Sequence, residues 1–117
     1  MRRMINIGKL NRKISLLKFF DVPDEMGQTT QVLRSVKTVW ASFVPIKGNE
    51  FYELQKLESK ITHKIYMRFL PEVDNTWYIG YRGKTYCVTA AIDVDNAGKL
   101  LELQCCEYTG KEEKKHG

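Results

Sequence analysis

The chain has 117 residues, of which 43% are hydrophobic and 28% charged, a length and composition typical of one globular domain with a single core. This composition excludes general disorder, which requires low hydrophobicity together with high net charge. A membrane-spanning helix needs about 18 or more consecutive apolar residues, and the sequence contains no such run.

The net charge of +5 is concentrated near the N-terminus. Residues 1–18 contain no acidic residue and six basic ones, namely Arg2, Arg3, Lys9, Arg12, Lys13 and Lys18. Such a block suits contact with phosphate or with an acidic protein surface, and it equally suits a solvated arm. We expect a basic arm over residues 1–11, a folded domain over residues 12–108 and a flexible polar tail over residues 109–117.

The first half of the domain has two strand-like segments separated by a polar one. Arg12–Phe20 is apolar and compatible with a strand, whereas Asp21–Thr30 combines Pro, Gly and acidic residues and is predicted to be a loop. Gln31–Ile46 is rich in β-branched and aromatic residues, as strands are. Its alternation slips near Val39 and Trp40, which predicts a bulge or a sharp bend there.

The segment Lys47–Lys60 interrupts the strand pattern. Phe51, Leu54 and Leu57 recur every three residues, a spacing typical of a helix. Asn49 could cap such a helix, but the segment is short for a helix that is stable by itself. We expect a helical turn or a structured loop.

The clearest strand pattern lies in Ile61–Phe69. Its alternating residues place one set of side chains on an apolar face: Ile61, His63, Ile65, Met67 and Phe69. The opposite face carries Thr62, Lys64, Tyr66 and Arg68. This period of two predicts a strand with one buried face.

The last third of the chain predicts a hairpin and a final strand. Thr76–Tyr81 and Lys84–Val94 flank the pair Arg82-Gly83, and the glycine strengthens the hairpin signal. Turns are expected at Leu70–Asn75 and Asp95–Gly98, and the last strand at Lys99–Tyr108. Together these elements predict a mainly β fold, a small six-stranded antiparallel β-barrel with one short helix or structured loop between its middle strands.

The sequence offers no recognisable catalytic, cofactor or metal site. His116 lies in the polar tail, and His63 lies on an apolar strand face, where a histidine is more often part of the core or its rim than a ligand. Asp93-x-Asp95 followed by Gly98 resembles the start of a calcium loop, but its twelfth position is Gln104 instead of a glutamate. No zinc-type cysteine pair and no glycine-rich phosphate loop is present. We predict no enzyme, no cofactor and no metal.

The three cysteines, Cys87, Cys105 and Cys106, make a poor disulfide framework because their number is odd. Neighbouring strand residues point to opposite faces, so Cys105 and Cys106 are not expected to share a site. We predict three reduced thiols that act as small apolar side chains.

Aromatic and basic residues around the Arg82-Gly83 hairpin leave an alternative function open. They are Trp77, Tyr78, Tyr81, Arg82, Lys84 and Tyr86. Small OB-like barrels stack single-stranded nucleic acid on exposed aromatic side chains within a basic groove. The interpretation that we favour is that Trp77, Ile79 and Tyr81 point into the core and that Arg82 and Lys84 flank a solvated turn.

Short segments of strand and turn sequence follow one another in a fixed order along residues 7–107. They are IGKLNRKISL, Thr38–Ser42, Pro45–Glu53, Gln55, Thr62–Ile65, Met67–Phe69, Ile79–Tyr86, Ile92-Asp93 and Leu101–Leu103. Together they resemble the head–tail joining proteins of tailed bacteriophages, also called head-closure or stopper proteins. The ordered occurrence of these segments, more than any one of them, carries the resemblance.

The resemblance implies a structural virion protein of a tailed phage or prophage, made in the cytoplasm of the bacterial host. Similar proteins are small β-barrels that form a ring at the head–tail connector, close the DNA-filled capsid and provide the surface to which the tail attaches. The implied partners are further copies of the chain, the portal or a head-completion adaptor protein, and a tail-completion protein. Double-stranded DNA passes through the channel without sequence-specific binding, and no membrane is involved.

The resemblance also implies roles for two groups of residues. In similar proteins a loop between two middle strands projects into the channel as a gate, and the corresponding residues are Lys47, Gly48, Asn49, Glu50, Phe51, Tyr52, Glu53, Gln55 and Lys56. The charges of Lys47–Lys60 sum to zero, which suits a wall that must not grip DNA. The segment Leu57–Lys60 stands where the family usually has an alanine-rich stretch. The basic residues Arg2, Arg3, Lys9, Arg12 and Lys13 are candidates for contact with a neighbouring subunit or with an acidic portal surface.

Overall fold

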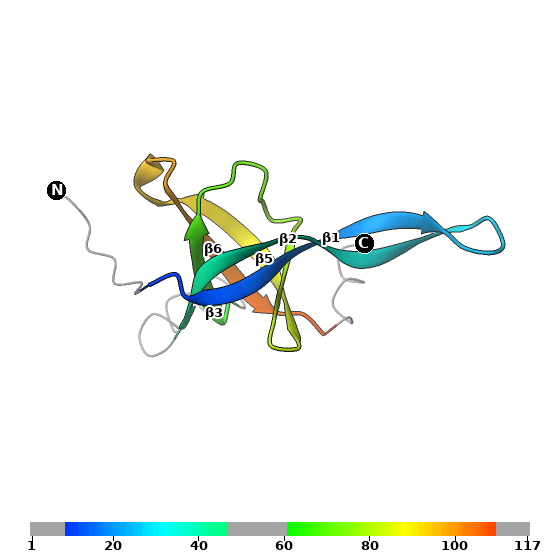
Figure 1. Ribbon diagram of the computed structural model, residues 1–117, viewed down its shortest axis with the longest axis horizontal. Helices are drawn as coiled ribbons and strands as arrows, with labels where there is room; N and C mark the ends of the chain where they lie inside the picture. The colour runs from blue at the N-terminus through cyan, green and yellow to red at the C-terminus, as the bar shows by residue number, and fades with distance from the viewer. Residues whose placement is uncertain (1–8, 47–60, 110–117) are drawn as a thin grey trace.

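The computed structural model describes residues 9–46 and 61–109, which form a mainly β structure (Figure 1). Its elements are β1 (Arg12–Pro23), β2 (Thr29–Pro45), β3 (His63–Arg68), β4 (Tyr78–Tyr81), β5 (Lys84–Asp93), the 3-10 turn η1 (Val94–Asn96) and β6 (Leu100–Glu107). All neighbouring strands pair antiparallel, and the order β1-β2-β3-β6-β5-β4 closes where β4 pairs with β1. The predicted six-stranded antiparallel barrel is therefore confirmed. The helical turn or structured loop predicted at residues 47–60 lies outside the described residues.

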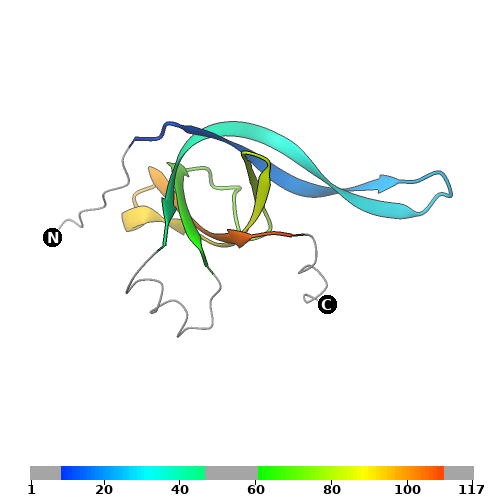
Figure 2. The same cartoon turned by 90° about the horizontal axis from the view of Figure 1, so that it is seen from below.

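Alternating side chains from the strands fill the barrel interior, whose closed outline is visible in Figure 2. On β6, for example, Leu101, Leu103 and Cys105 are buried, whereas the residues between them are less so. The side chains with almost no exposed surface are Ile14, Leu16, Ile65, Met67, Ile79, Leu103 and Cys105. Each fully buried aliphatic side chain stabilises the fold by about 1.5–3 kcal/mol, so the core follows directly from the period of two in the sequence.

The strand β3 confirms the predicted inner face and corrects the outer one. Ile65 and Met67 are fully buried, as the alternation predicts. Tyr66, on the face predicted to be polar, is also buried, and its hydroxyl donates a hydrogen bond to Oε1 of Glu102 on β6 at 3.1 Å. The strand itself is shorter than the pattern suggests, because pairing with both neighbours runs only from His63 to Arg68 at most.

The most prominent feature outside the barrel is a long β1–β2 hairpin (Figures 1 and 2). The two strands pair from Arg12 opposite Ala41 to Pro23 opposite Thr29. Their barrel neighbours contact only the inner portion, since β4 pairs with residues 15–17 and β3 with residues 41–45. The rest projects as a two-stranded ribbon, and the molecule measures 58 Å along its longest axis against 29 and 25 Å across.

The loop predicted at Asp21–Thr30 is therefore wrong for half of its length. Only residues 24–28 form the turn, in which Oδ1 of Asp24 accepts hydrogen bonds from the backbone N–H groups of Met26 at 2.9 Å and Gln28 at 2.8 Å. Gly27 has a φ of 84°, a left-handed conformation that glycine adopts at little cost. The proline and acidic residues near the turn are compatible with strands that have no further neighbour.

The bulge predicted at Val39 and Trp40 is also misplaced. The β1–β2 register shifts between Leu16 and Leu17, opposite Lys37 and Ser35, which leaves Val36 as the extra residue. A bulge bends its strand and increases the local twist. It marks the point where the hairpin stops following the barrel wall and begins to project from it.

The β4–β5 hairpin forms at Arg82-Gly83, as predicted. Tyr81 pairs with Lys84, and the two turn residues have φ values of 52° and 78°. Positive φ at both central positions is the signature of a type I′ turn, whose twist matches that of the flanking strands. The strand β4 begins only at Tyr78, because the backbone N–H of Thr76 donates to Oδ1 of Asp74 at 2.9 Å in the preceding turn.

Candidate functional site

The described residues, 9–46 and 61–109, contain no group of three or more His, Cys, Asp or Glu side chains that could hold a metal ion. The Asp93 carboxylate, which begins the calcium-like pattern, instead accepts a hydrogen bond from the backbone N–H of Gly98 at 2.9 Å and closes the β5–β6 turn. Within the same residues, no helix has the length and apolar character needed to cross a membrane.

The half-buried His63 is part of an aromatic cluster at the rim of the barrel. Its ring centroid lies 5.7 Å from that of Phe43 and 5.2 Å from that of Tyr86, and its Nδ1 lies 2.9 Å from Oγ1 of Thr62. Burial lowers the pKa of His63 below its ordinary value of 6.5; nearby Glu107 opposes this shift and Lys84 adds to it. The surroundings are those of a packed rim residue.

We expect the free energy of unfolding to fall as the pH drops below 6.5, in a way that depends on His63. Because the pKa is lower in the folded state, the unfolded chain takes up the proton first, so acidification through this window favours unfolding. Urea unfolding at about pH 7.5 and about pH 5.5 should show a smaller difference for His63→Gln than for the wild type. An identical difference in both proteins would contradict the assignment.

A group of basic and aromatic side chains gathers where β1 begins, beside β2 and the β4–β5 turn; we call it the basic–aromatic patch. It consists of Arg12, Lys13, Trp40, Tyr81 and Arg82, which line a shallow depression of about 340 Å³. Lys13 lies directly opposite Trp40 in the β1–β2 ladder, with its Nζ 5.3 Å from the ring centroid. The Cζ of Arg82 lies 5.3 Å from the ring centroid of Tyr81. Cation–π attraction orients both cations over the rings.

Trp40 is the centre of this patch. It is 54% exposed, although a tryptophan is among the side chains that gain most from burial. An exposed tryptophan close to tyrosine and arginine is typical of a protein-binding surface.

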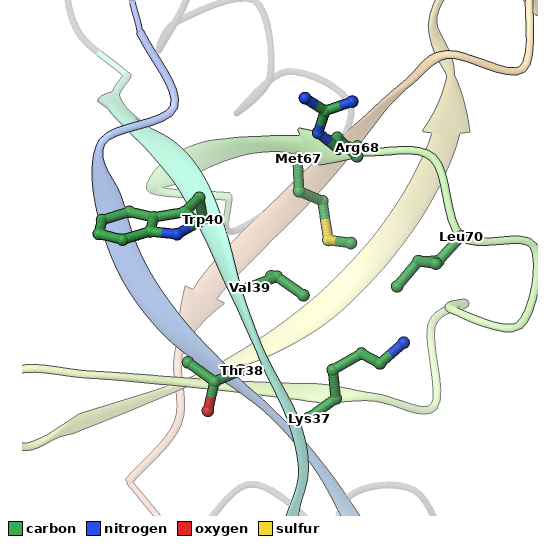
Figure 3. A pocket seen from close by; sticks show the side chains of 7 residues that line it. All are labelled: Lys37, Thr38, Val39, Trp40, Met67, Arg68 and Leu70. Carbon is green, nitrogen blue, oxygen red and sulfur yellow. The ribbon is translucent and has the colours of Figure 1, made fainter.

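A second depression, which we call the β2 groove, lies where β2 separates from β3. It is lined by Lys37, Thr38, Val39, Trp40, Met67, Arg68 and Leu70 and has a volume of about 300 Å³. Figure 3 shows Val39, Met67 and Leu70 directed into the groove and Trp40 turned to the other side of the β2 ribbon. The groove therefore has an apolar floor and two cationic edges, Lys37 and Arg68.

The structure describes only some of the residues that the sequence predicts to be functional. Lys9, which precedes β1, is exposed, as are Arg12 and Lys13 at the start of β1. Arg12 and Lys13 belong to the basic–aromatic patch. Arg2 and Arg3 lie outside the described residues. The same holds for all the predicted channel-loop residues, which are Lys47, Gly48, Asn49, Glu50, Phe51, Tyr52, Glu53, Gln55 and Lys56.

No pattern in the sequence associates Trp40 or Arg82 with the basic residues of β1. Arg82 follows β4, and the pairing of β4 with β1 that closes the barrel brings it toward Arg12. Trp40 is exposed because its side chain lies on the outward face of β2, between the inward-facing Val39 and Ala41.

The aromatic residues around the Arg82-Gly83 hairpin do not form an open row for stacking bases. Trp77 and Tyr86 are 5% and 6% exposed, respectively, and Ile79 is fully buried. Tyr81 packs against the core, and the ring of Tyr78 makes edge-to-face contacts with Phe19 and Tyr108 at centroid distances of 5.1 and 4.9 Å. The favoured interpretation, that Trp77, Ile79 and Tyr81 serve the core, is therefore confirmed.

The three cysteines occupy two different environments, and none is joined in a disulfide. Cys105 is buried inside the barrel, and this burial raises the pKa of its thiol well above the ordinary range. Cys87 and Cys106 are half-buried and directly opposite one another on β5 and β6, with their Sγ atoms 3.0 Å apart. The prediction that Cys105 and Cys106 do not share a site is confirmed. The proximity of Cys87 to Cys106 could not be predicted, because it depends on the register between β5 and β6.

We expect oxidised glutathione to join Cys87 to Cys106 and to leave Cys105 as a thiol. Opposed residues of antiparallel strands have Cα atoms about 4.5–5.5 Å apart, within the range of about 4.4–6.8 Å that disulfides span. Peptide mapping by mass spectrometry after oxidation of the folded protein would identify the linked pair. The variant Cys106→Ser is the control, and a disulfide that includes Cys105 in the wild type would contradict the expectation.

The sequence matches the model of a family described as "Phage head completion protein" over residues 5–108. No curated protein matches it. The fold is similar to the solution structure of a protein from Shigella flexneri 2a, with a TM-score of 0.72 and 21% identity, over 92% of this chain and 100% of that one. It is also similar to a chain in the virion of a native gene transfer agent particle, with a TM-score of 0.56 and 18% identity, over 86% of this chain and 97% of the other. At these identities the two structures establish a shared fold.

Proposed function

Because the chain belongs to the phage head completion protein family, a family of structural virion proteins, we propose that it forms a ring at the head–tail connector of a tailed phage or prophage particle. The ring closes the head after DNA has been packaged and provides the surface to which the tail attaches. The family match over residues 5–108 is the observation that carries this proposal. The role is structural, without catalysis, and the protein is made in the cytoplasm of the bacterial host.

The fold and surface of the described residues support this role. A closed barrel leaves few unpaired strand edges and makes a rigid unit for repetition around an axis. The similarity to a chain of a gene transfer agent virion supports assembly into a particle. The exposed Trp40 and its surrounding cations offer a surface for protein contact.

The proposed partners are other copies of the chain, the portal or a head-completion adaptor, and a tail-completion protein. Double-stranded DNA passes through the ring without sequence-specific contact. The segment assigned to the channel by resemblance, Lys47–Lys60, connects β2 with its barrel neighbour β3, and its role as a gate is part of this proposal. The basic arm, including Lys9, Arg12 and Lys13, is proposed to contact a neighbouring subunit or the portal.

Deletion of the gene from the phage or prophage tests the proposal. Without the protein, we expect heads that lose their DNA and carry no tails, and we expect wild-type protein supplied from a plasmid to restore both. Electron microscopy would show the tails, and nuclease-protected DNA per particle would measure closure. Tailed particles that keep their DNA without the protein would overturn the proposal.

A binding assay separates this function from the nucleic-acid-binding alternative. A basic single-strand-binding barrel retains DNA at low salt and releases it steeply as salt rises. We expect the purified chain to show little binding at either salt concentration, since Trp77 and Tyr86 are buried.

A further inference from the structure

The projecting end of the β1–β2 hairpin is apolar and acidic; we call residues 20–32 the hairpin tip. Phe20 lies opposite Val32 in the ladder and is 43% exposed, and Met26 in the turn is 83% exposed. The tip carries Asp21, Asp24 and Glu25 and contains no lysine or arginine. Its charge is therefore opposite to that of the chain as a whole.

An isolated two-stranded ribbon with exposed apolar side chains is marginally stable in water. In the described residues, neither strand of the hairpin tip pairs with a third strand, so both of its edges are open. Open edges with apolar side chains are used for pairing with another chain or must be protected from it. These properties suit a segment that docks on a protein.

The surface with complementary properties is the basic–aromatic patch together with the β2 groove. Among the described residues, those that line the two depressions include five cations and no carboxylate. The cations are Arg12, Lys13, Lys37, Arg68 and Arg82. Apolar contact is available from the exposed Trp40 and from Val39, Met67 and Leu70.

The backbone adds a second form of complementarity at the same place. In the part of the chain that the structure describes, β2 pairs with β3 only from Ala41 onward, so residues 37–40 have β1 on one side and the groove on the other. An open strand edge beside an apolar groove is the geometry that accepts an added strand, with main-chain hydrogen bonds giving affinity and side-chain pockets giving specificity.

A chain cannot bring its own hairpin tip to its own patch. The pair Lys13–Trp40 and the pair Pro23–Thr29 belong to the same ladder and are ten residues apart along β1. At about 3.3 Å per residue they are separated by about 33 Å of continuous strand. The two complementary surfaces can therefore meet only between two copies.

We propose that the hairpin tip of each copy docks on the basic–aromatic patch and β2 groove of the next copy. This contact joins two different surfaces, which is the head-to-tail type of contact from which rings are built when the rotation between neighbouring copies closes. The inference rests on the ring proposed above and specifies its subunit contact. Trp40 is the central anchor of the contact. Attraction between the acidic residues of the hairpin tip and the cations of the patch and groove steers the two copies together and fixes how they align.

Photo-crosslinking in assembled particles tests which surface the tip contacts. The full chain with Met26→p-benzoylphenylalanine is produced as a mixture of normal and ¹⁵N-labelled copies. We expect crosslinked peptides that join residue 26 of one isotope to residues 37–40 or 67–70 of the other. Crosslinks only to portal or tail proteins, only within one copy, or to another face of the barrel would overturn the proposal.

Substitutions on both surfaces provide a functional test in the deletion strain. We expect Trp40→Ala and Glu25→Lys each to lower nuclease-protected DNA per particle at least about tenfold, the loss that corresponds to one contact of about 1.4 kcal/mol or more. The matched controls Ile92→Ala and Glu72→Lys change exposed residues outside both surfaces and should stay near the wild type. Thermal unfolding of the purified variants shows whether each barrel still folds.

Charge reversal in the basic–aromatic patch allows a test by rescue of DNA retention. Arg82→Glu should reduce DNA retention, its control Lys99→Glu should not, and Arg82→Glu combined with Glu25→Lys should recover part of the loss. If folded Trp40→Ala and Glu25→Lys proteins retain DNA as well as their controls, the docking proposal is overturned while head completion stands. If wild-type protein itself makes no difference to DNA retention, the proposed function fails instead.

Discussion

Replacement of Ile65 by alanine is expected to lower the free energy of unfolding by about 3 kcal/mol. Ile65 is fully buried on β3, where Phe43 of β2 and Leu103 of β6 lie opposite it. Truncation leaves a cavity that a closed barrel fills poorly, because every strand is held by two neighbours. Domains of this size are stable by about 5–15 kcal/mol, so the loss is a large fraction of the total.

Ile92→Ala is the matched control, because it makes the same chemical change on β5 at a side chain that is 42% exposed. We expect its effect to stay within about 0.5 kcal/mol. Urea unfolding followed by circular dichroism and by tryptophan fluorescence measures both variants. If the two isoleucines gave equal losses, the alternating interior described here would not be the source of stability.

The parts of the fold that could be predicted from sequence are those where one local rule decides the structure. On β3, the alternation that places Ile65 and Met67 inside is set by burial of one strand face. At the β4–β5 hairpin, Arg82-Gly83 supplies the positive φ values that a type I′ turn requires. Barrel closure follows because six short strands otherwise leave open edges.

The projecting part of the hairpin could not be predicted, because beyond Phe19 its strands have no core to face. Alternation arises only where one side of a strand is buried, and residues 20–32 pair with each other outside the barrel. Proline, glycine and acidic residues are typical of loops, but they are also compatible with a ribbon whose edges are solvated. The composition of Asp21–Thr30 therefore gave a misleading signal.

The candidate site was only partly predictable for a related reason. The positive charge of Arg12 and Lys13 is visible in the sequence, but their neighbours Trp40 and Arg82 come from strands that meet through barrel closure and register. A tryptophan in a strand is normally expected to be buried. Its 54% exposure here follows from its place on the outward face of β2, and the slip of the alternation at Val39 and Trp40 does not reveal which of the two faces outward.

Shortening the hairpin is expected to abolish head closure and leave the barrel folded. In this variant residues 21–31 are replaced by Asn-Gly, which supplies a two-residue turn between the opposed residues Phe20 and Val32. The contacts that hold the base of the ribbon remain, since Lys18 lies over the ring of Trp77 at 5.1 Å and Phe19 packs edge-to-face with Tyr78. We therefore expect the free energy of unfolding to change by less than about 1 kcal/mol.

Nuclease-protected DNA per particle in the deletion strain should fall to the level seen without any protein, because the shortened chain lacks the acidic and apolar tip. A double substitution, Gln28→Ala with Thr30→Ala, keeps the length, the acidic residues and Met26, and should support closure like the wild type. The two measurements together separate a structural from an assembly role. A barrel that unfolds on shortening would show that the ribbon supports the fold, and a folded, shortened chain that still closes heads would show that ring formation uses other surfaces.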